Sequence, residues 1–120
     1  MSIPASADPG EDVDMSCFWP YNTNNKTVKW YRRKEKSVDA ELMSEFVADR
    51  NIVQEKYRGR IIAHTQENYA RNFDITLLNV AGYDSAFYWC VVTIATVPYA
   101  AEEKFMTVKS KHALISKYMN

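Results

Sequence analysis

The run at residues 84–90, Asp-Ser-Ala-Phe-Tyr-Trp-Cys, constrains the fold most, because it holds the second of only two cysteines. Side chains of a β-strand point alternately to opposite faces. Tyr88 and Cys90 therefore share one side of such a strand, while Phe87 and Trp89 share the other. If the first side faces a core, Cys90 can reach a partner cysteine through that core. The second side then presents large apolar groups for which the protein must have a use.

Two cysteines in a small β-rich domain indicate one disulfide, formed in an oxidising compartment. Metal ligation is the alternative, but the chain has no Cys-x-x-Cys pair. His64 and His112 also lack the spacing that is typical of zinc ligands. We therefore expect a disulfide and no metal.

The pattern Asp-x-Ala-x-Tyr-x-Cys at 84–90 resembles strand F of the immunoglobulin superfamily, and of its variable-type (V-set) domain in particular. Trp30 follows Cys17 within Val-Lys-Trp-Tyr-Arg-Arg, which resembles strand C. The resemblance, over residues 10–109, implies an all-β immunoglobulin-like Greek-key β-sandwich of two antiparallel sheets joined by a Cys17–Cys90 disulfide. It also implies that Trp30 packs on the disulfide, that Tyr88 fastens the preceding corner, and that Arg60 pairs with Asp84. An unrelated β-sandwich is the alternative.

The length of 120 residues suits one domain with one core. We expect a flexible lead-in over 1–9 with a short strand near Ile3, a V-type domain over 10–109, and a stalk remnant or disordered tail over 110–120. Helix propensity alone also allows a helical turn over 40–47. Alternation and turn signals predict strands over 13–17, 28–33, 42–47, 60–64, 73–78, 86–93 and 104–108, with an apolar F–G loop over 94–101. Residues 51–53 form either a further strand, C″, or part of a loop.

Charge and hydropathy exclude several classes of protein. Basic and acidic residues balance at fifteen each, whereas a nucleic-acid binder usually has a basic excess. No apolar run reaches the length of about 18 residues needed to span a membrane, and the residues after Met1 lack the features of a signal peptide. With the disulfide, this predicts an extracellular or cell-surface ectodomain of a protein that is anchored in a membrane.

The sequence contains no arrangement typical of an enzyme. His64 is the only histidine within the domain and lies on a predicted strand without a nucleophile beside it. Glu102 and Glu103 form a loop charge pair rather than an acid/base dyad. Three glycines do not supply a phosphate-binding loop. We therefore expect no catalytic residues and no cofactor.

The outer face of strands G, F, C and C′ is the candidate functional surface. Aromatic residues beside arginine have the composition of an interface hot spot, and contiguous exposed apolar area usually marks a partner. The alternatives are that residues 35–57 cover these groups, that the surface is merely tolerated, and that the F–G loop packs on itself. The predicted partner-binding residues are Trp89, Tyr31, Phe87, Val91, Arg33, Lys29, Val97, Pro98 and Tyr99.

The resemblance implies a non-catalytic recognition module: the ectodomain of an immune receptor, co-receptor or ligand that binds another cell-surface protein. Burial of Trp89, Tyr31 and the F–G tip would supply affinity, with Arg33 and Lys29 steering toward acidic groups. An immunoglobulin-like partner and a homodimer both fit this expectation. Asn25 begins an N-glycosylation triplet on the predicted B–C loop, which predicts a glycoprotein.

Three other functions remain open. A homophilic adhesion domain would have a self-complementary patch, and a virus-encoded immunoglobulin-like decoy would look the same in sequence. A carbohydrate-binding V-set domain of the sialic-acid type ranks last, because it would need an arginine on strand F. An antigen-receptor chain is disfavoured because strand G lacks the Phe-Gly-x-Gly motif.

Overall fold

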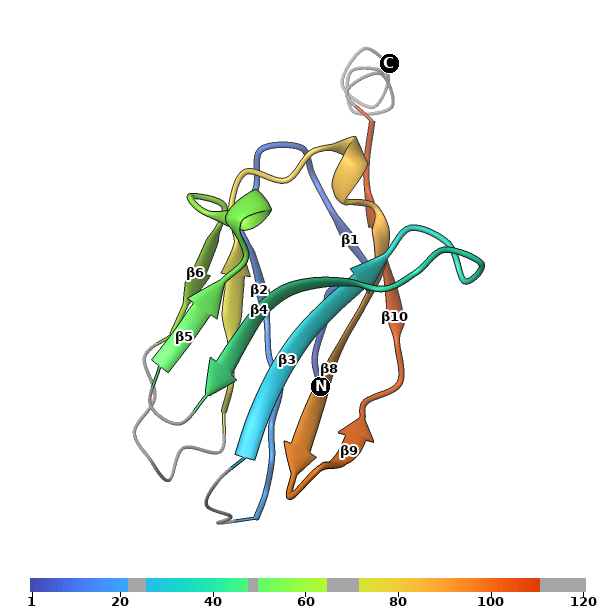
Figure 1. Ribbon diagram of the computed structural model, residues 1–120. Helices are drawn as coiled ribbons and strands as arrows, with labels where there is room; N and C mark the ends of the chain where they lie inside the picture. The colour runs from blue at the N-terminus through green and yellow to red at the C-terminus, as the bar shows by residue number, and fades with distance from the viewer. Residues whose placement is uncertain (22–25, 48–49, 65–71, 111–120) are drawn as a thin grey trace, which may run out of the picture.

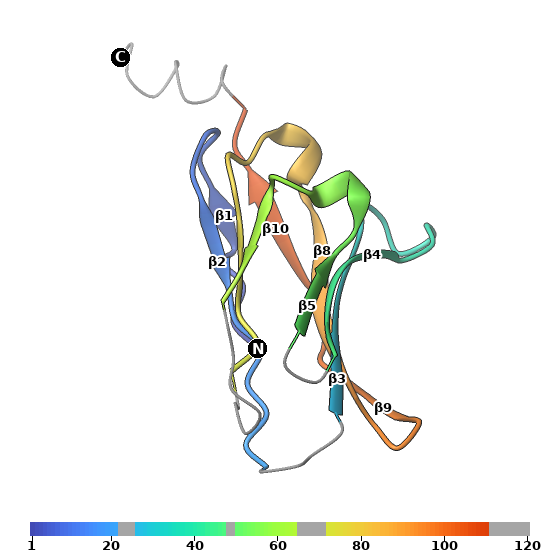
Figure 2. The ribbon, with the colours of Figure 1, turned by 60° about the vertical axis from the view of Figure 1, so that its left-hand side comes forward.

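The computed structural model describes residues 1–21, 26–47, 50–64 and 72–110. These residues form two β-sheets that pack face to face, as Figure 2 shows nearly edge-on. The all-β sandwich predicted from the sequence is therefore confirmed. Asn25 and residues 111–120 of the predicted tail lie outside the described residues.

The larger sheet is built on two long central strands, β3 (Lys26–Arg33) and β8 (Ala86–Ile94) (Figure 1). Buried and half-buried residues alternate along both strands. This alternation lets one side of each strand face the core while the other side forms the outer face of the sheet. The strands of this sheet are, in order, β1 (Ser6–Ala7), β10 (Lys104–Val108), β8, β3, β4 (Glu41–Val47) and β5 (Arg50–Val53), with β9 (Val97–Ala100) also paired to β8.

The smaller sheet is antiparallel, and its strands are β2 (Val13–Met15), β7 (Ile75–Leu77) and β6 (Ile61–Ala63). Two short 3₁₀ helices, η1 (Glu55–Tyr57) and η2 (Gly82–Asp84), lie in the connections. The helical alternative for 40–47 is wrong, since β4 pairs with both β3 and β5 and this pairing overrides local propensity. Within the described residues, no helix is long and apolar enough to cross a membrane.

The N-terminal residues correct two expectations. Ser6 and Ala7 pair in parallel with β10, so the larger sheet is mixed rather than antiparallel. Backbone hydrogen bonds fix this strand, including one of 2.9 Å from Lys109 N to Ala7 O, and Ala7 is buried. Near the strand expected at Ile3, Ser2 forms an isolated bridge with Ser16. Residues 2–7 are therefore part of the folded domain, and the predicted boundary at residue 10 is too late.

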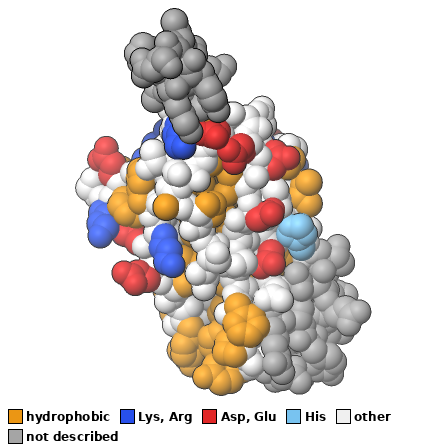
Figure 3. All heavy atoms as spheres, turned by 180° about the vertical axis from the view of Figure 1, so that it is seen from behind, with side chains coloured by type: hydrophobic (Ala, Val, Ile, Leu, Met, Phe, Trp, Pro, Cys, Tyr) orange, Lys and Arg blue, Asp and Glu red, His pale blue; other side chains and the backbone are white. Residues whose placement is uncertain are grey.

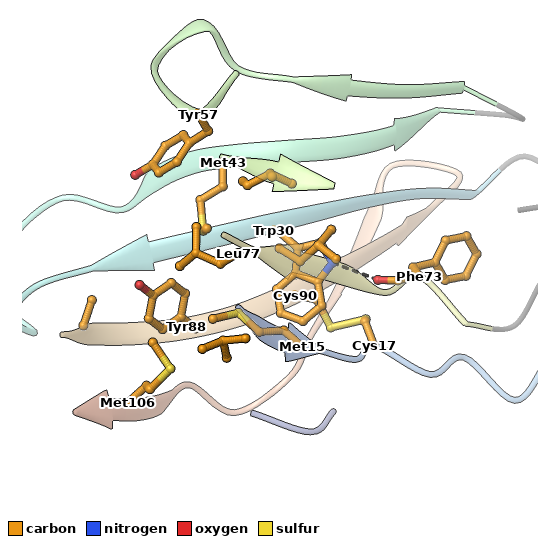
Figure 4. Packing of buried hydrophobic residues seen from close by; sticks show 14 of the residues in the cluster. Met15, Cys17, Trp30, Met43, Tyr57, Phe73, Leu77, Tyr88, Cys90 and Met106 are labelled. Atoms are coloured by element: carbon orange, nitrogen blue, oxygen red, sulfur yellow. Dashed lines mark hydrogen bonds between the residues drawn. A yellow bond between two sulfur atoms is a disulfide. The ribbon is translucent and has the colours of Figure 1, made fainter. Parts of the chain in front are cut away.

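The core lies between the sheets around the predicted disulfide. Cys17 and Cys90 are bonded, with their Cα atoms 6.3 Å apart. Trp30 is opposite Cys90 in the β3–β8 register and is fully buried against the disulfide (Figure 4). Its indole N–H donates a 2.9 Å hydrogen bond to the Phe73 carbonyl, so the buried polar atom has a partner. The disulfide and the place of Trp30 are thus as the sequence predicted.

The segment predicted as the F–G loop is a β-hairpin rather than an irregular loop. β8 and β9 are joined by Ala95 and Thr96, and both have a positive φ, at 48° and 72°. Two residues in this conformation make a type I′ turn, which matches the twist of paired strands. Beyond the hairpin, Ala100 of β9 is opposite Val91, and Lys104 of β10 is opposite Tyr88. The step is three residues along β8 but four along the returning chain. One extra residue is therefore accommodated as a bulge between β9 and β10.

Thr96 is a poor residue for its position, and replacing it with glycine should stabilise the domain. A left-handed conformation costs a side-chain-bearing residue about 1–2 kcal/mol, while glycine loses about 0.5–1 kcal/mol more chain entropy on folding. We expect Thr96→Gly to raise the free energy of unfolding by about 0.5–1 kcal/mol in urea titrations. Thr107→Gly, at an exposed position in β10 with ordinary φ, should instead lower it. Equal losses in both variants would contradict the left-handed turn.

Candidate functional site

The outer face of the larger sheet carries paired aromatic side chains. Tyr31 on β3 is opposite Trp89 on β8, and their rings stack with centroids 5.6 Å apart and an interplanar angle of 16°. Phe87 on β8 is opposite Phe105 on β10, and these rings meet edge to face at 4.9 Å. The register alone brings the rings together, because opposite residues of antiparallel strands point to the same face. We call these four residues the aromatic face.

Arg33 lies at one end of the aromatic face and is held by several contacts. Its guanidinium forms two hydrogen bonds with the Glu103 carboxylate, at 2.7 and 2.9 Å, and a third with the Lys36 carbonyl at 3.0 Å. It also lies over the Trp89 ring, 5.5 Å from the centroid. In the free domain Arg33 is therefore occupied by Glu103, which weakens the expectation that it steers acidic groups of a partner.

The apolar character continues along the same face toward the hairpin. Val91 lies between Lys29 on β3 and Ala100 on β9, and Lys29 in turn is opposite Glu45 on β4. The register thus sets a basic and an acidic side chain next to each other beside the aromatic face. The predicted residues Phe87, Trp89, Val91, Lys29, Tyr31 and Arg33 are therefore brought together on one side of the sheet.

The three predicted tip residues do not form one surface. Pro98 is opposite Thr93 and shares the outer side of the sheet with Val91. Val97 and Tyr99 are opposite Ile94 and Val92, so they point to the other side, where Val92 is buried. The hairpin therefore presents different residues to the two sides of the sheet, and of the three only Pro98 lies on the same side as the aromatic face.

A second group of aromatic residues, which the sequence did not lead us to expect, lies at the end of the sandwich where Tyr99 lies. Trp19 contacts Tyr21 and Tyr99, with ring centroids 5.2 and 5.4 Å apart. Phe18 precedes them and is exposed. The signal in the sequence is Phe-Trp-Pro-Tyr directly after Cys17, which is unusually apolar for a loop.

A buried ionic network supports the sheet under the start of β8. Asp84 is fully buried and binds Arg32 and Arg60, each at 2.8 Å. The Tyr88 hydroxyl donates a 2.6 Å hydrogen bond to the Asp84 carbonyl, which fastens the corner. Arg60, Asp84 and Tyr88 were expected here, and Arg32, which shares the inner side of β3 with Trp30, joins them in the structure. Burial raises the pKa of Tyr88 to about 12, so its hydroxyl stays protonated and donating.

The same network holds the pKa of Asp84 below its usual value. Burial alone would raise this pKa, but hydrogen bonds from Arg60, the Ala81 N–H and Arg32 outweigh it. The charged carboxylate is therefore the stable form in the folded domain.

A scan of family models against this sequence matches the immunoglobulin V-set domain over residues 2–109. The chain belongs to the immunoglobulin V-set family. Among curated proteins, no sequence matches this chain. V-set domains are commonly recognition modules and are generally non-catalytic, and the disulfide is typical of extracellular domains.

His64 of this V-set domain lies in a hydrogen-bond chain on the outer side of the smaller sheet. Thr76 donates its hydroxyl proton to Asp14 at 2.6 Å, so its oxygen accepts the 2.9 Å bond from the His64 Nε2–H. A nucleophilic hydroxyl would instead have to give its proton to the histidine. This geometry therefore does not activate Thr76. Among the described residues, no group of three or more His, Cys, Asp or Glu side chains is placed to hold a metal ion.

Proposed function

We propose that this V-set domain is a non-catalytic cell-surface recognition module that binds another protein through the aromatic face. The observation that carries the proposal is the continuity of the Tyr31–Trp89 and Phe87–Phe105 pairs across β3, β8 and β10. β4 and β5 extend the same sheet beside these rings instead of folding over them. Large aromatic groups on a sheet face that no other described strand covers are what an interface core requires.

The side chains of the aromatic face are positioned by contacts within the domain itself. Its four rings lie in two pairs, and Lys36 and Arg33 lie over Phe87 and Trp89 at 5.6 and 5.5 Å. A surface whose side chains are already ordered loses less entropy on binding. The ion pair of Arg33 and Glu103 lies at the edge, where charges contribute more to orientation and association rate than to affinity.

The proposed setting is extracellular, with the full-length protein anchored in a membrane. The disulfide supports an oxidising compartment. The proposed partner is another cell-surface protein, and an immunoglobulin-like partner would offer a similar flat sheet face. Homophilic adhesion is the second candidate, because the face contains both basic and acidic groups, Lys29 and Glu45 being neighbours.

A binding screen tests this proposal. A multivalent form of the domain would be tested against displayed cell-surface ectodomains and against itself, because multivalency reveals weak contacts. Trp89→Arg should weaken a specific interaction by at least about 30-fold, as expected for a hot-spot residue. Ile62→Arg is the matched control, since Ile62 is exposed on the outer side of the smaller sheet. Loss of self-binding in Trp89→Arg would establish homophilic adhesion, and binding that survives this change would refute the proposed face.

A further inference from the structure

Apolar side chains from distant parts of the chain gather at one end of the sandwich. Phe18 and Tyr21 follow β2 and are 54% and 63% exposed, while Val97 and Tyr99 on β9 are 49% and 50% exposed. Trp19 lies between the two segments and contacts Tyr21 and Tyr99. Figure 3 shows hydrophobic side chains grouped at the lower end of the molecule, the end at which β9 lies in Figure 1. We call these five residues the aromatic end.

A hollow of about 190 Å³ opens beside the aromatic end. Trp19 and Tyr99 contribute to its lining, and the Cys17–Cys90 disulfide and Val92 form its buried inner part. Ala101 also lines it and is half-buried against the core. Met1 lines it too and carries the α-amino group of the chain, but none of the described residues in the lining has a charged side chain.

The size and chemistry of the hollow limit what it can hold. An apolar cavity of about 150 Å³ takes up a benzene ring, so this space suits one ring or one branched aliphatic group. A charged group would lose its hydration without gaining a counter-charge among the lining side chains. The hollow is therefore suited to a single uncharged apolar group.

The surroundings of the hollow indicate how that group is delivered. Phe18 lines the hollow, whereas Tyr21, which is 63% exposed, extends the apolar surface beyond it, where a small free molecule would leave it uncovered. Addition of a partner's β-strand to β9 is disfavoured. Ile94 and Val97 flank the two-residue turn as a hydrogen-bonded pair, so the next residue, Pro98, has its backbone nitrogen at the outer edge of β9. This nitrogen has no hydrogen and cannot donate to an added strand. Side chains of a partner, rather than its backbone, must make the contact.

We propose that the hollow receives one aromatic or branched aliphatic side chain from a loop of the partner protein, and that the aromatic end covers the surface around it. This inference rests on the proposed recognition function and adds a second contact region to it. The partner would therefore carry an apolar anchor residue on a loop without nearby charge.

An NMR titration of the whole disulfide-bonded chain, followed through its methyl resonances, tests this inference. N-acetylphenylalanine amide and benzene should shift the Val92 and Ala101 methyl signals, with dissociation constants on the order of 1 mM. N-acetyllysine amide has the same backbone but a charged side chain, and it should not shift these signals. Ala101→Leu should fill the hollow and weaken binding at least tenfold, whereas Ala63→Leu, at another half-buried alanine packed on the core, should not.

Several results would overturn the inference. Shifts at neither methyl group would show that the hollow binds nothing, and binding of benzene without the amide would make it a site for free small molecules. Unchanged binding in Ala101→Leu, or equal binding of the lysine amide, would also contradict it, as would concentration-dependent dimers that bury the aromatic end. If Ala101→Leu does not fold, Tyr99→Ser should weaken binding relative to Tyr83→Ser, which changes an equally exposed tyrosine in η2.

The hollow and the aromatic face can be judged separately. Trp89→Arg should leave the amide titration unchanged, since Trp89 is not part of the lining. A partner found in the screen should lose affinity in both Tyr99→Ser and Trp89→Arg. Loss in Trp89→Arg alone would leave the proposed function standing and refute the contact at the hollow.

Discussion

Replacing Asp84 with asparagine should lower the free energy of unfolding by about 3–5 kcal/mol. Asp84 is fully buried and is the carboxylate that holds both Arg32 and Arg60. Arg32 is itself buried, so the substitution leaves a guanidinium inside the domain without its counter-charge. Denaturant unfolding of the two proteins at neutral pH measures the loss.

The cause can be isolated by a second substitution. Arg32→Met in the Asp84→Asn background removes the stranded charge and should restore part of the lost stability, because the two changes are coupled. Asp39→Asn changes an exposed aspartate in the β3–β4 connection and should stay within about 0.5 kcal/mol of the original protein. A double variant no more stable than Asp84→Asn would contradict the explanation by an unpaired charge.

The same residue predicts the acid branch of the stability curve. The pKa of Asp84 is lowered in the folded domain, so the unfolded chain binds its proton first as the pH falls. The stability that Asp84 contributes through its lowered pKa is therefore fully present above about pH 5. It is lost as the pH falls through the ordinary aspartate pKa of about 3.9 toward the lower pKa of Asp84 in the folded domain. Asp84→Asn should therefore flatten this part of the curve. Parallel acid branches in the original protein and Asp84→Asn would contradict the lowered pKa.

The alternation of strand F explains why so much of the fold could be predicted from the sequence. A period of two assigns Tyr88 and Cys90 to the core and Trp89 to the outer face, without any knowledge of the neighbouring strands. The same rule assigned Trp30 and Arg32 to the inner side of their strand. It could not show that Arg32 reaches Asp84, because that contact depends on the crossing of segments 52 residues apart.

The hairpin shows what the sequence could not reveal. Type I′ turns normally have Asn-Gly or a related pair, and Ala95-Thr96 gives no such signal. Without the turn the register of β9 is unknown, and a shift of one residue exchanges the two faces of a strand. This is why Tyr99 was expected beside the aromatic face but lies near Trp19. Loop residues such as Phe18 and Tyr21 have no period at all, so only the structure joins them to β9.

Breaking the Cys17–Cys90 bond should be comparable in effect to the Asp84 substitution. The bond closes a loop between cysteines 73 residues apart, and losing a crosslink of that span should lower the free energy of unfolding by about 4 kcal/mol in the chain-entropy description. Cys17→Ala/Cys90→Ala also removes both sulfur atoms from the surroundings of Trp30, which leaves a cavity in the core. The variant should therefore be less stable than the reduced original protein.

Guanidinium unfolding with and without a reductant separates these two contributions. Adding the reductant to the original protein removes the crosslink but keeps the sulfur volume, so its shift reports the crosslink alone. The Cys17→Ala/Cys90→Ala variant should not respond to the reductant, and its remaining deficit relative to the reduced original measures the packing around Trp30. A reductant that breaks the bond without changing the unfolding midpoint would show that the two sheets are held together by the core itself. The disulfide would then indicate the compartment in which the domain works rather than the source of its stability.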